Sequence, residues 1–163
     1  MNDFSTAAEK IKIIELLNQF GIAIDSRDWD TFSSLFADEV EFDYSAIGDI
    51  AGTFQPSEIA DNARKNFGGF KATQHQITNH QIERSSNDAH CKAYVRAMHV
   101  LPNDETDSML EIGGYYLARL ISIDSNWKIK SWKFEVFWSK GDLALFELAK
   151  KTSWAIANNK IIF

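Results

Sequence analysis

The apolar residues of this 163-residue chain change their spacing near the middle of the sequence. Over most of the first 69 residues they recur at steps of three and four, which places them on one face of an α-helix. After residue 70 they alternate with polar residues over long stretches, as in strands that bury one face. Helices followed by long strands predict an α+β fold, with the helices on one face of a strongly curved, mostly antiparallel sheet. The space between these layers can hold a small molecule.

The expected elements follow from these patterns and from the residues that begin and end them. The first helix begins near Thr6, and a second, short helix is capped by Asp28 and ends near residues 36–37. Pro56 opens a third helix, which the paired glycines at 68–69 stop. Strands are expected at residues 39–44, 53–55, 72–84, 91–99, 109–123 and 127–138, and a C-terminal helix from residue 142.

Size and composition narrow the class of protein. We expect one domain, residues 1–163, with a core at about 6–140 and a C-terminal helix and tail at 141–163. The formal net charge of −6 argues against nucleic acid as a partner, because a grip on phosphates needs clustered Lys and Arg. Cys91 is the only cysteine, so no disulfide can form within the chain. No apolar run approaches the roughly 20 residues of a membrane span, and no signal-peptide pattern opens the sequence, so we expect a cytoplasmic protein without membrane association.

Asp25 is notable for its place at the end of the first expected helix. On a wheel of about 100° per residue it lies within roughly 20° of Ile14, at the edge of the apolar stripe. A carboxylate in the last turn faces the negative end of the helix dipole, which is unfavourable by about 0.3–1 kcal/mol unless something compensates. The compensation is either a cap or turn around residues 26–28 or a partner in a functional site.

His75 lies inside the first long strand. Strand alternation places it on one face with Thr73, Ile77 and Asn79. The same alternation places His80 on the opposite face, where we interpret it as a surface or sheet-edge residue. His75 is therefore the histidine of this strand that can meet Asp25 across a pocket.

His99 ends a row of small and apolar residues on the next strand and is the only ionisable group in that row. Such a row indicates either a concave surface with space above it or close packing against a helix. His90 falls on the opposite face. Tyr44 points inward from the strand expected at 39–44 and is either a core aromatic or a hydrogen-bonding group in the pocket. The last long strand presents an aromatic face of Trp132, Phe134, Val136 and Trp138. Gly113 and Gly114 interrupt the strand expected at 109–123, where we expect a bulge or sharp bend.

In order and spacing these residues resemble the cone-shaped nuclear transport factor 2-like fold, and within it the SnoaL-like branch and the scytalone dehydratase family. The resemblance runs from about residue 11 to residue 138. One position differs, because those dehydratases have a tyrosine immediately before their aspartate and this chain has Ile24. The residues that carry the resemblance are Asp25 followed by Asp28-Trp29-Asp30, the pair Asp43-Tyr44, the segment Thr73-Gln74-His75, His99, Trp127-Lys128 and Trp138.

The resemblance implies an acid–base site. His75 is expected to remove a proton next to a carbonyl, while Asp25 accepts the other ring N–H and stabilises the charged imidazole. His99 and Tyr44 are expected to donate hydrogen bonds to the carbonyl oxygen as negative charge develops there. The further substrate-binding candidates are Asn79, Phe134 and Trp138.

The predicted function is that of a small-molecule lyase, a dehydratase that removes water from a β-hydroxy carbonyl compound of polyketide- or steroid-like character. Double-bond isomerisation and hydrogen halide elimination on the same pair are alternatives, and a non-catalytic ligand-binding or interaction module is another. We expect no cofactor and no metal. Asp25, His75 and His99 nevertheless have the residue types of a zinc or iron site.

The sequence also predicts a homo-oligomer, either a dimer or a trimer. The aromatic sheet face exceeds what three helices can cover, and the chain ends in the apolar residues Ile161, Ile162 and Phe163. We expect this tail either to fold over the pocket or to sit on a neighbouring subunit.

Overall fold

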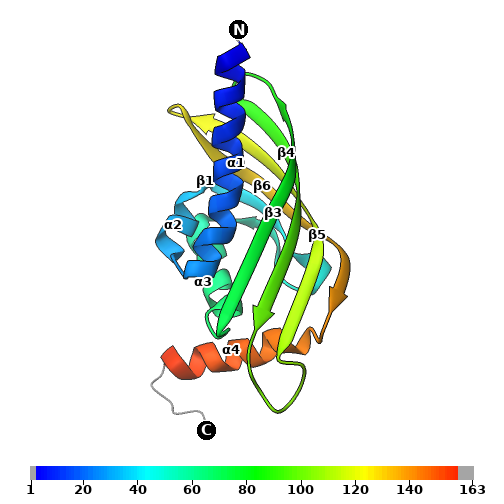
Figure 1. Cartoon of the computed structure of the whole chain (residues 1–163). Coiled ribbons are helices and arrows are strands. Elements are labelled where there is room, and N and C mark those ends of the chain that lie inside the picture. Colours follow the sequence, from blue (N-terminus) through cyan, green and yellow to red (C-terminus); the bar gives the residue numbers. More distant parts are fainter. Residues whose placement is uncertain (1–2, 158–163) are drawn as a thin grey trace.

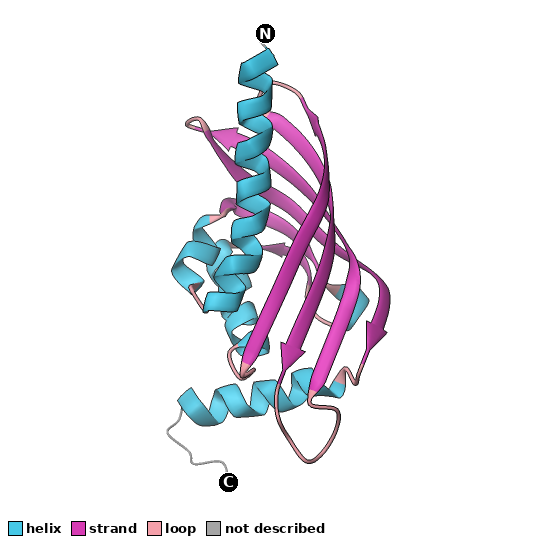
Figure 2. Ribbon diagram, in the orientation of Figure 1, coloured by secondary structure: helices cyan, strands magenta, loops and turns pink. Residues whose placement is uncertain are grey.

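A computed structural model describes residues 3–157 and confirms the α+β class. The tail at residues 161–163 lies outside the described residues. Figures 1 and 2 show α1, α2 and α3 along one side of a curved sheet, with α4 across the end where β3 begins. The helices are α1 (Asp3–Ser26), α2 (Trp29–Ser34), α3 (Pro56–Phe67) and α4 (Ala144–Ala157), with a 3₁₀ turn η1 (Ser45–Ile47). The strands are β1 (Phe36–Asp43), β2 (Ala51–Phe54), β3 (Ala72–Arg84), β4 (Asp88–Val100), β5 (Met109–Ile123) and β6 (Asn126–Lys140).

The strand order in the sheet is β2-β1-β6-β5-β4-β3. All neighbours are antiparallel except β1 and β6, which run parallel. This order makes β3 an edge strand, and α1 packs against it. None of the helices within residues 3–157 is long and apolar enough to cross a membrane.

The helix boundaries follow from their caps. The Asp28 carboxylate accepts the Thr31 amide at 3.0 Å and starts α2, as expected. This helix ends at Ser34, and β1 begins at Phe36, three residues before the expected start. The reason is tertiary, because Phe36 already pairs with Ile129 of β6. Sequence alternation alone did not reveal that pairing.

The core lies between the helices and the sheet face that they cover, and aromatic rings fill much of it. Phe20 of α1 stacks on Trp132 of β6, with ring centroids 4.0 Å apart, and also contacts Tyr116 of β5. Trp132 is 0% exposed. Fully buried aromatic rings of this size dominate the energetics of a core, so Phe20 and Trp132 fix α1 against the middle of the sheet.

A bulge in β3 changes which residues face the core. The register with β4 shifts between Thr78 and Gln81, and Asn79 has a positive φ of 55°. Before the bulge Ile77 is buried, and after it the half-buried His80 and Ile82 face inward. The expectation that Asn79 shares a face with His75 is therefore wrong, and so is the expectation that His80 lies on the opposite face. Asn79 is exposed.

The bulge expected at Gly113 and Gly114 is confirmed. Gly114 pairs with Val136 but Gly113 pairs with Trp138, which leaves Phe137 as the extra residue. A Cβ on Gly113 would lie 2.2 Å from the Trp138 ring, so only glycine fits beneath that ring. The bulge turns Trp138 to the outer face, where it is 44% exposed. The expected inward position of Trp138 is therefore wrong.

Candidate functional site

Asp25 and His75 meet where α1 passes along the edge strand β3. A Cβ added to Gly21 would lie 2.9 Å from the His75 Cβ, so the glycine allows the helix to come this close. Asp25 follows one turn later, in the last turn of α1. Because β3 has no neighbour on this edge in the described sheet, the His75 amide is free to donate to Asp25 Oδ2, at 2.8 Å.

Three donors hold the Asp25 carboxylate. His75 Nδ1 lies 2.7 Å from Asp25 Oδ1, Thr73 donates its hydroxyl to the same oxygen at 2.9 Å, and the His75 amide binds Oδ2. Burial opposes ionisation of Asp25, but the hydrogen bonds and the charge interaction with His75 outweigh it and hold the carboxyl pKa below its ordinary value. An ionised carboxylate only accepts hydrogen bonds, so Nδ1 of His75 donates. The lone pair of a neutral His75 is then on Nε2, where it can accept a proton.

His99 of β4 lies beside His75, with ring centroids 5.8 Å apart. Its ring also contacts Phe67, Phe70 and Phe146, and it is 2% exposed. Burial, followed by the charge of His75, lowers the pKa of His99 to about 3. Its Nδ1 lies 3.3 Å from the Leu110 carbonyl oxygen, which can only accept. In the neutral ring Nε2 therefore has no proton, so at neutral pH His99 offers an acceptor where the sequence predicted a donor.

This buried histidine makes the fold sensitive to acid. The unfolded chain protonates His99 below its ordinary pKa of 6.5, whereas the folded chain does so only near pH 3. The unfolded state therefore binds more protons between these values, and the folded state loses stability as the pH falls through this window, by at most about 1.4 kcal/mol per pH unit. We expect His99→Leu to lose less stability than the wild type from pH 6.5 toward pH 3, measured by urea unfolding. Parallel curves for the two proteins would contradict this assignment.

Tyr44 and Phe134 lie deeper in the core. Both rings contact Tyr116, at centroid distances of 6.4 Å and 5.3 Å, and they contact each other at 5.4 Å. Burial raises the pKa of Tyr44 above its ordinary value, although the side chains of Tyr116 and Trp132 act in the opposite direction. The tyrosine is therefore a neutral phenol. Its ring packs on Phe42, Tyr116 and Phe134.

Sequence reasoning missed several residues of this region. Tyr116 faces the same interior as Tyr44, and strand alternation from Gly114 could have placed it there. The Trp132 Nε1 group is buried without a hydrogen-bond partner among the described residues. Phe67 of α3 and Phe146 of α4 both contact the His99 ring. No sequence signal indicated that both rings cover His99.

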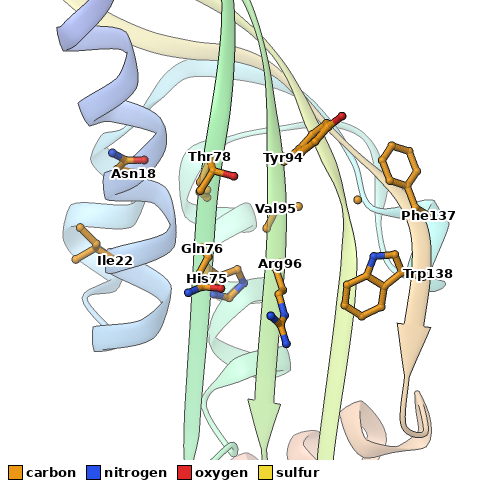
Figure 3. Close-up of a pocket in the computed structure, with 12 residues that line it drawn as sticks. Asn18, Ile22, His75, Gln76, Thr78, Tyr94, Val95, Arg96, Phe137 and Trp138 are labelled. Atoms are coloured by element: carbon orange, nitrogen blue, oxygen red, sulfur yellow. The ribbon is translucent and has the colours of Figure 1, made fainter.

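Two hollows lie near these groups. An open groove of about 810 Å³ runs from Tyr94, Phe137 and Trp138 on the outer sheet face to the edge between α1 and β3, where Ile22 and His75 also line it (Figure 3). A crevice of about 70 Å³ lies between η1, α3 and α4 and reaches Phe67 and Phe146. The His75 side chain is only 3% exposed. Within residues 3–157, no group of three His, Cys, Asp or Glu side chains is placed to hold a metal ion.

Comparison with known proteins identifies relatives of the whole fold. A family model for the SnoaL-like domain matches residues 5–133. No curated protein matches the sequence. A protein from Kribbella flavida is 24% identical with a TM-score of 0.82, and the match covers 87% of this chain and 99% of the other. A candidate scytalone dehydratase from Novosphingobium aromaticivorans is 18% identical with a TM-score of 0.76, covering 85% and 91%. A hexachlorocyclohexane dehydrochlorinase from Novosphingobium barchaimii is 19% identical with a TM-score of 0.73, covering 86% and 94%.

Proposed function

The chain belongs to the SnoaL-like domain family, and from this premise we propose that it is a cofactor-independent lyase that uses Asp25 and His75 to remove water from a small β-hydroxy carbonyl compound. The observation that supports this proposal is the 2.7 Å contact between Asp25 Oδ1 and His75 Nδ1, which leaves His75 Nε2 as a base. A histidine suits this task because its ordinary pKa lies near neutral pH.

In the proposed reaction His75 Nε2 takes a proton from the carbon next to the carbonyl. The electron pair left behind forms the new carbon–carbon double bond while the bond to the β-hydroxyl breaks. The imidazolium returns its proton to the departing hydroxyl, which leaves as water. Asp25 stabilises the imidazolium between these two steps, because its carboxylate is ionised and in contact with Nδ1.

The surrounding side chains suggest how the substrate is held. The rings of Phe67, Phe70 and Phe146 favour a small, flat, apolar body. His99 Nε2 would accept a hydrogen bond from a substrate hydroxyl, and the hydroxyls of Tyr44 and Tyr116 are the nearby neutral donors for a carbonyl oxygen. We propose that the substrate enters through the crevice between η1, α3 and α4 and displaces the Phe146 ring.

Hydrogen halide elimination is the second candidate reaction. The dehydrochlorinase from Novosphingobium barchaimii shares the fold, and the neutral state of His99 favours a leaving group that needs no proton. The first step on His75 is the same in both reactions. Double-bond isomerisation would also begin with that step but would return the proton to another carbon.

A substrate panel tests the proposal. It contains aromatic β-hydroxy ketones, their β-chloro analogues and β,γ-unsaturated ketones, assayed with the wild type and Asp25→Asn. Loss of water, release of chloride, and an absorbance change at constant mass distinguish the three reactions. Equal turnover by both proteins would remove the pair from the mechanism. Binding without any turnover would support the non-catalytic module instead.

We also propose that the chain forms a homo-oligomer through the outer sheet face. Tyr94, Phe137 and Trp138 expose large apolar surfaces there, and Phe137 is 58% exposed. We expect the wild type to sediment as an oligomer and Phe137→Lys to sediment as a smaller species in analytical ultracentrifugation. Leu143→Lys is the control, because Leu143 is also exposed, at 44%, but lines the crevice between η1, α3 and α4 and not this face. A wild type that stays monomeric at all concentrations would refute the proposal.

A further inference from the structure

Arg27 occupies a backbone position at which glycine is the usual residue. It follows the last residue of α1 and has a left-handed φ of 61°. Its amide bonds to the Ile24 carbonyl at 3.1 Å, and the Asp28 amide bonds to the Ala23 carbonyl at 2.9 Å. This pair of bonds is the Schellman motif, which favours glycine because a Cβ is strained at this φ. Strain of this kind persists only where the surrounding contacts hold the residue in place, so the contacts of the Arg27 side chain matter.

The Arg27 side chain turns back across the end of α1 toward the start of β3. Its guanidinium donates to the Ile24 carbonyl at 2.6 Å, to the Thr73 hydroxyl oxygen at 2.8 Å and to the Phe70 carbonyl at 3.3 Å. The side chain therefore joins the last turn of α1, which carries Asp25, to the strand that carries His75. A weaker contact of 3.4 Å reaches the Asp25 carbonyl.

Thr73 connects this guanidinium to the Asp25 carboxylate. Its hydroxyl oxygen accepts from Arg27, so the hydroxyl proton is left to donate elsewhere, and it donates to Asp25 Oδ1 at 2.9 Å. The same oxygen accepts from His75 Nδ1. A guanidinium only donates and an ionised carboxylate only accepts, and together these two groups fix the direction of every bond in the chain from Arg27 through Thr73 and Asp25 to His75.

Resting on the proposed function, we propose that Arg27 is a positioning residue for the Asp25–His75 pair, and that it acts through the Thr73 hydroxyl. Without the guanidinium, the Thr73 hydroxyl loses the donor that fixes its orientation and can turn away from Asp25. Asp25 Oδ1 would keep only His75 as a partner. The carboxylate could then turn within its site, and the imidazole that it holds would lose its fixed orientation.

Arg27→Gly separates this role from a purely structural one. Glycine keeps the Schellman backbone and relieves its strain, so the end of α1 is expected to stay folded. We expect kcat to fall about 10–100-fold with little change in KM, by analogy with the outer-shell partners of metal-bound histidines, whose loss costs this much activity. Thr73→Val is expected to lower kcat as much as Arg27→Gly does. Thr73→Ser is expected to keep the wild-type kcat because it keeps the hydroxyl. The double variant Arg27→Gly/Thr73→Val should be no worse than either single variant, since both break one chain of bonds.

A measurement without substrate keeps the proposal testable if the proposed function fails. The ring N–H proton of His75, which is buried and bonded to a carboxylate, is followed by NMR in the full-length wild type and the same variants. We expect its signal to shift or broaden in Arg27→Gly and Thr73→Val and to keep its wild-type position in Thr73→Ser. An unchanged signal in Arg27→Gly would overturn the positioning role whatever the reaction. A shifted signal in a protein that turns over no panel compound would support the positioning role and reject only the proposed function.

Discussion

Replacing His75 with alanine is expected to lower kcat/KM by about 10²–10⁴-fold, the usual contribution of a positioned general base. The variant removes the one ring nitrogen that the 2.7 Å contact with Asp25 leaves available for proton transfer. It leaves the Thr73 hydroxyl bonded to Asp25, so the carboxylate keeps a partner and the fold should survive. The measurement is steady-state turnover of whichever panel compound the wild type consumes, with circular dichroism as the check on folding.

His80→Ala is the matched control for this experiment. His80 is on the same strand, half-buried, and on the inward side after the bulge, but its Nε2 has no hydrogen-bond partner among the described residues. Truncating it removes an imidazole of the same size without touching a carboxylate. We expect its turnover to stay within a few-fold of the wild type, a small change beside the about 10²–10⁴-fold loss from a general base. If His75→Ala retains as much activity as His80→Ala, His75 is not the base.

The fold was predictable from the sequence because its signals are local. The apolar spacing of α1 and α3, the proline that opens α3, and the alternation along β4 each depend on neighbours within one or two turns. A bulge beside Gly113 was also predictable, since glycine inside a strand typically marks a bulge, a tight bend or a close approach of another group. Its extra residue, Phe137, lies in the neighbouring strand β6. The α+β class followed from the order of these elements.

The strand phases beyond the bulges were not predictable. Nothing in the local pattern marks Asn79 as the residue at which β3 shifts its register against β4, because the shift is defined by the pairing of two strands. One extra residue reverses the faces of everything that follows. That single effect accounts for the errors at Asn79 and His80, and the bulge in β6 accounts for the error at Trp138.

The candidate site was predictable only in part, because the contacts that complete it join residues far apart in the sequence. Asp25 could be singled out because a carboxylate is unfavourable at the C-terminal end of a helix. His75 could be singled out because of its strand position and because its segment resembles that of a known family. The partners that decide their chemistry come from elsewhere. Arg27 sits in an ordinary turn sequence, and the proton position on His99 depends on the Leu110 carbonyl of a neighbouring strand.

Trp132 and Trp138 test the phase change in β6 directly. Simple alternation places both rings on one inward face, but the structure buries Trp132 completely and leaves Trp138 44% exposed. Trp132→Ala is expected to lower the free energy of unfolding by about 3–5 kcal/mol, the range for a buried aromatic truncated to alanine. Trp138→Ala is expected to change it by no more than about 0.5–1 kcal/mol. Urea unfolding at one protein concentration measures both values.

Most of the Trp132 effect should come from lost packing, because the ring is fully buried against Phe20 and Tyr116. Trp132→Phe therefore provides an internal check, since it keeps a ring against Phe20 and Tyr116 and should recover much of the loss. Repeating the unfolding after tenfold dilution distinguishes a loss of association through the outer face from a loss of core packing. Association makes the apparent stability depend on protein concentration, whereas burial within one chain does not. A concentration-independent loss for Trp138→Ala as large as that for Trp132→Ala would mean that both rings are in the core and that the strand continues through Phe137 without a bulge.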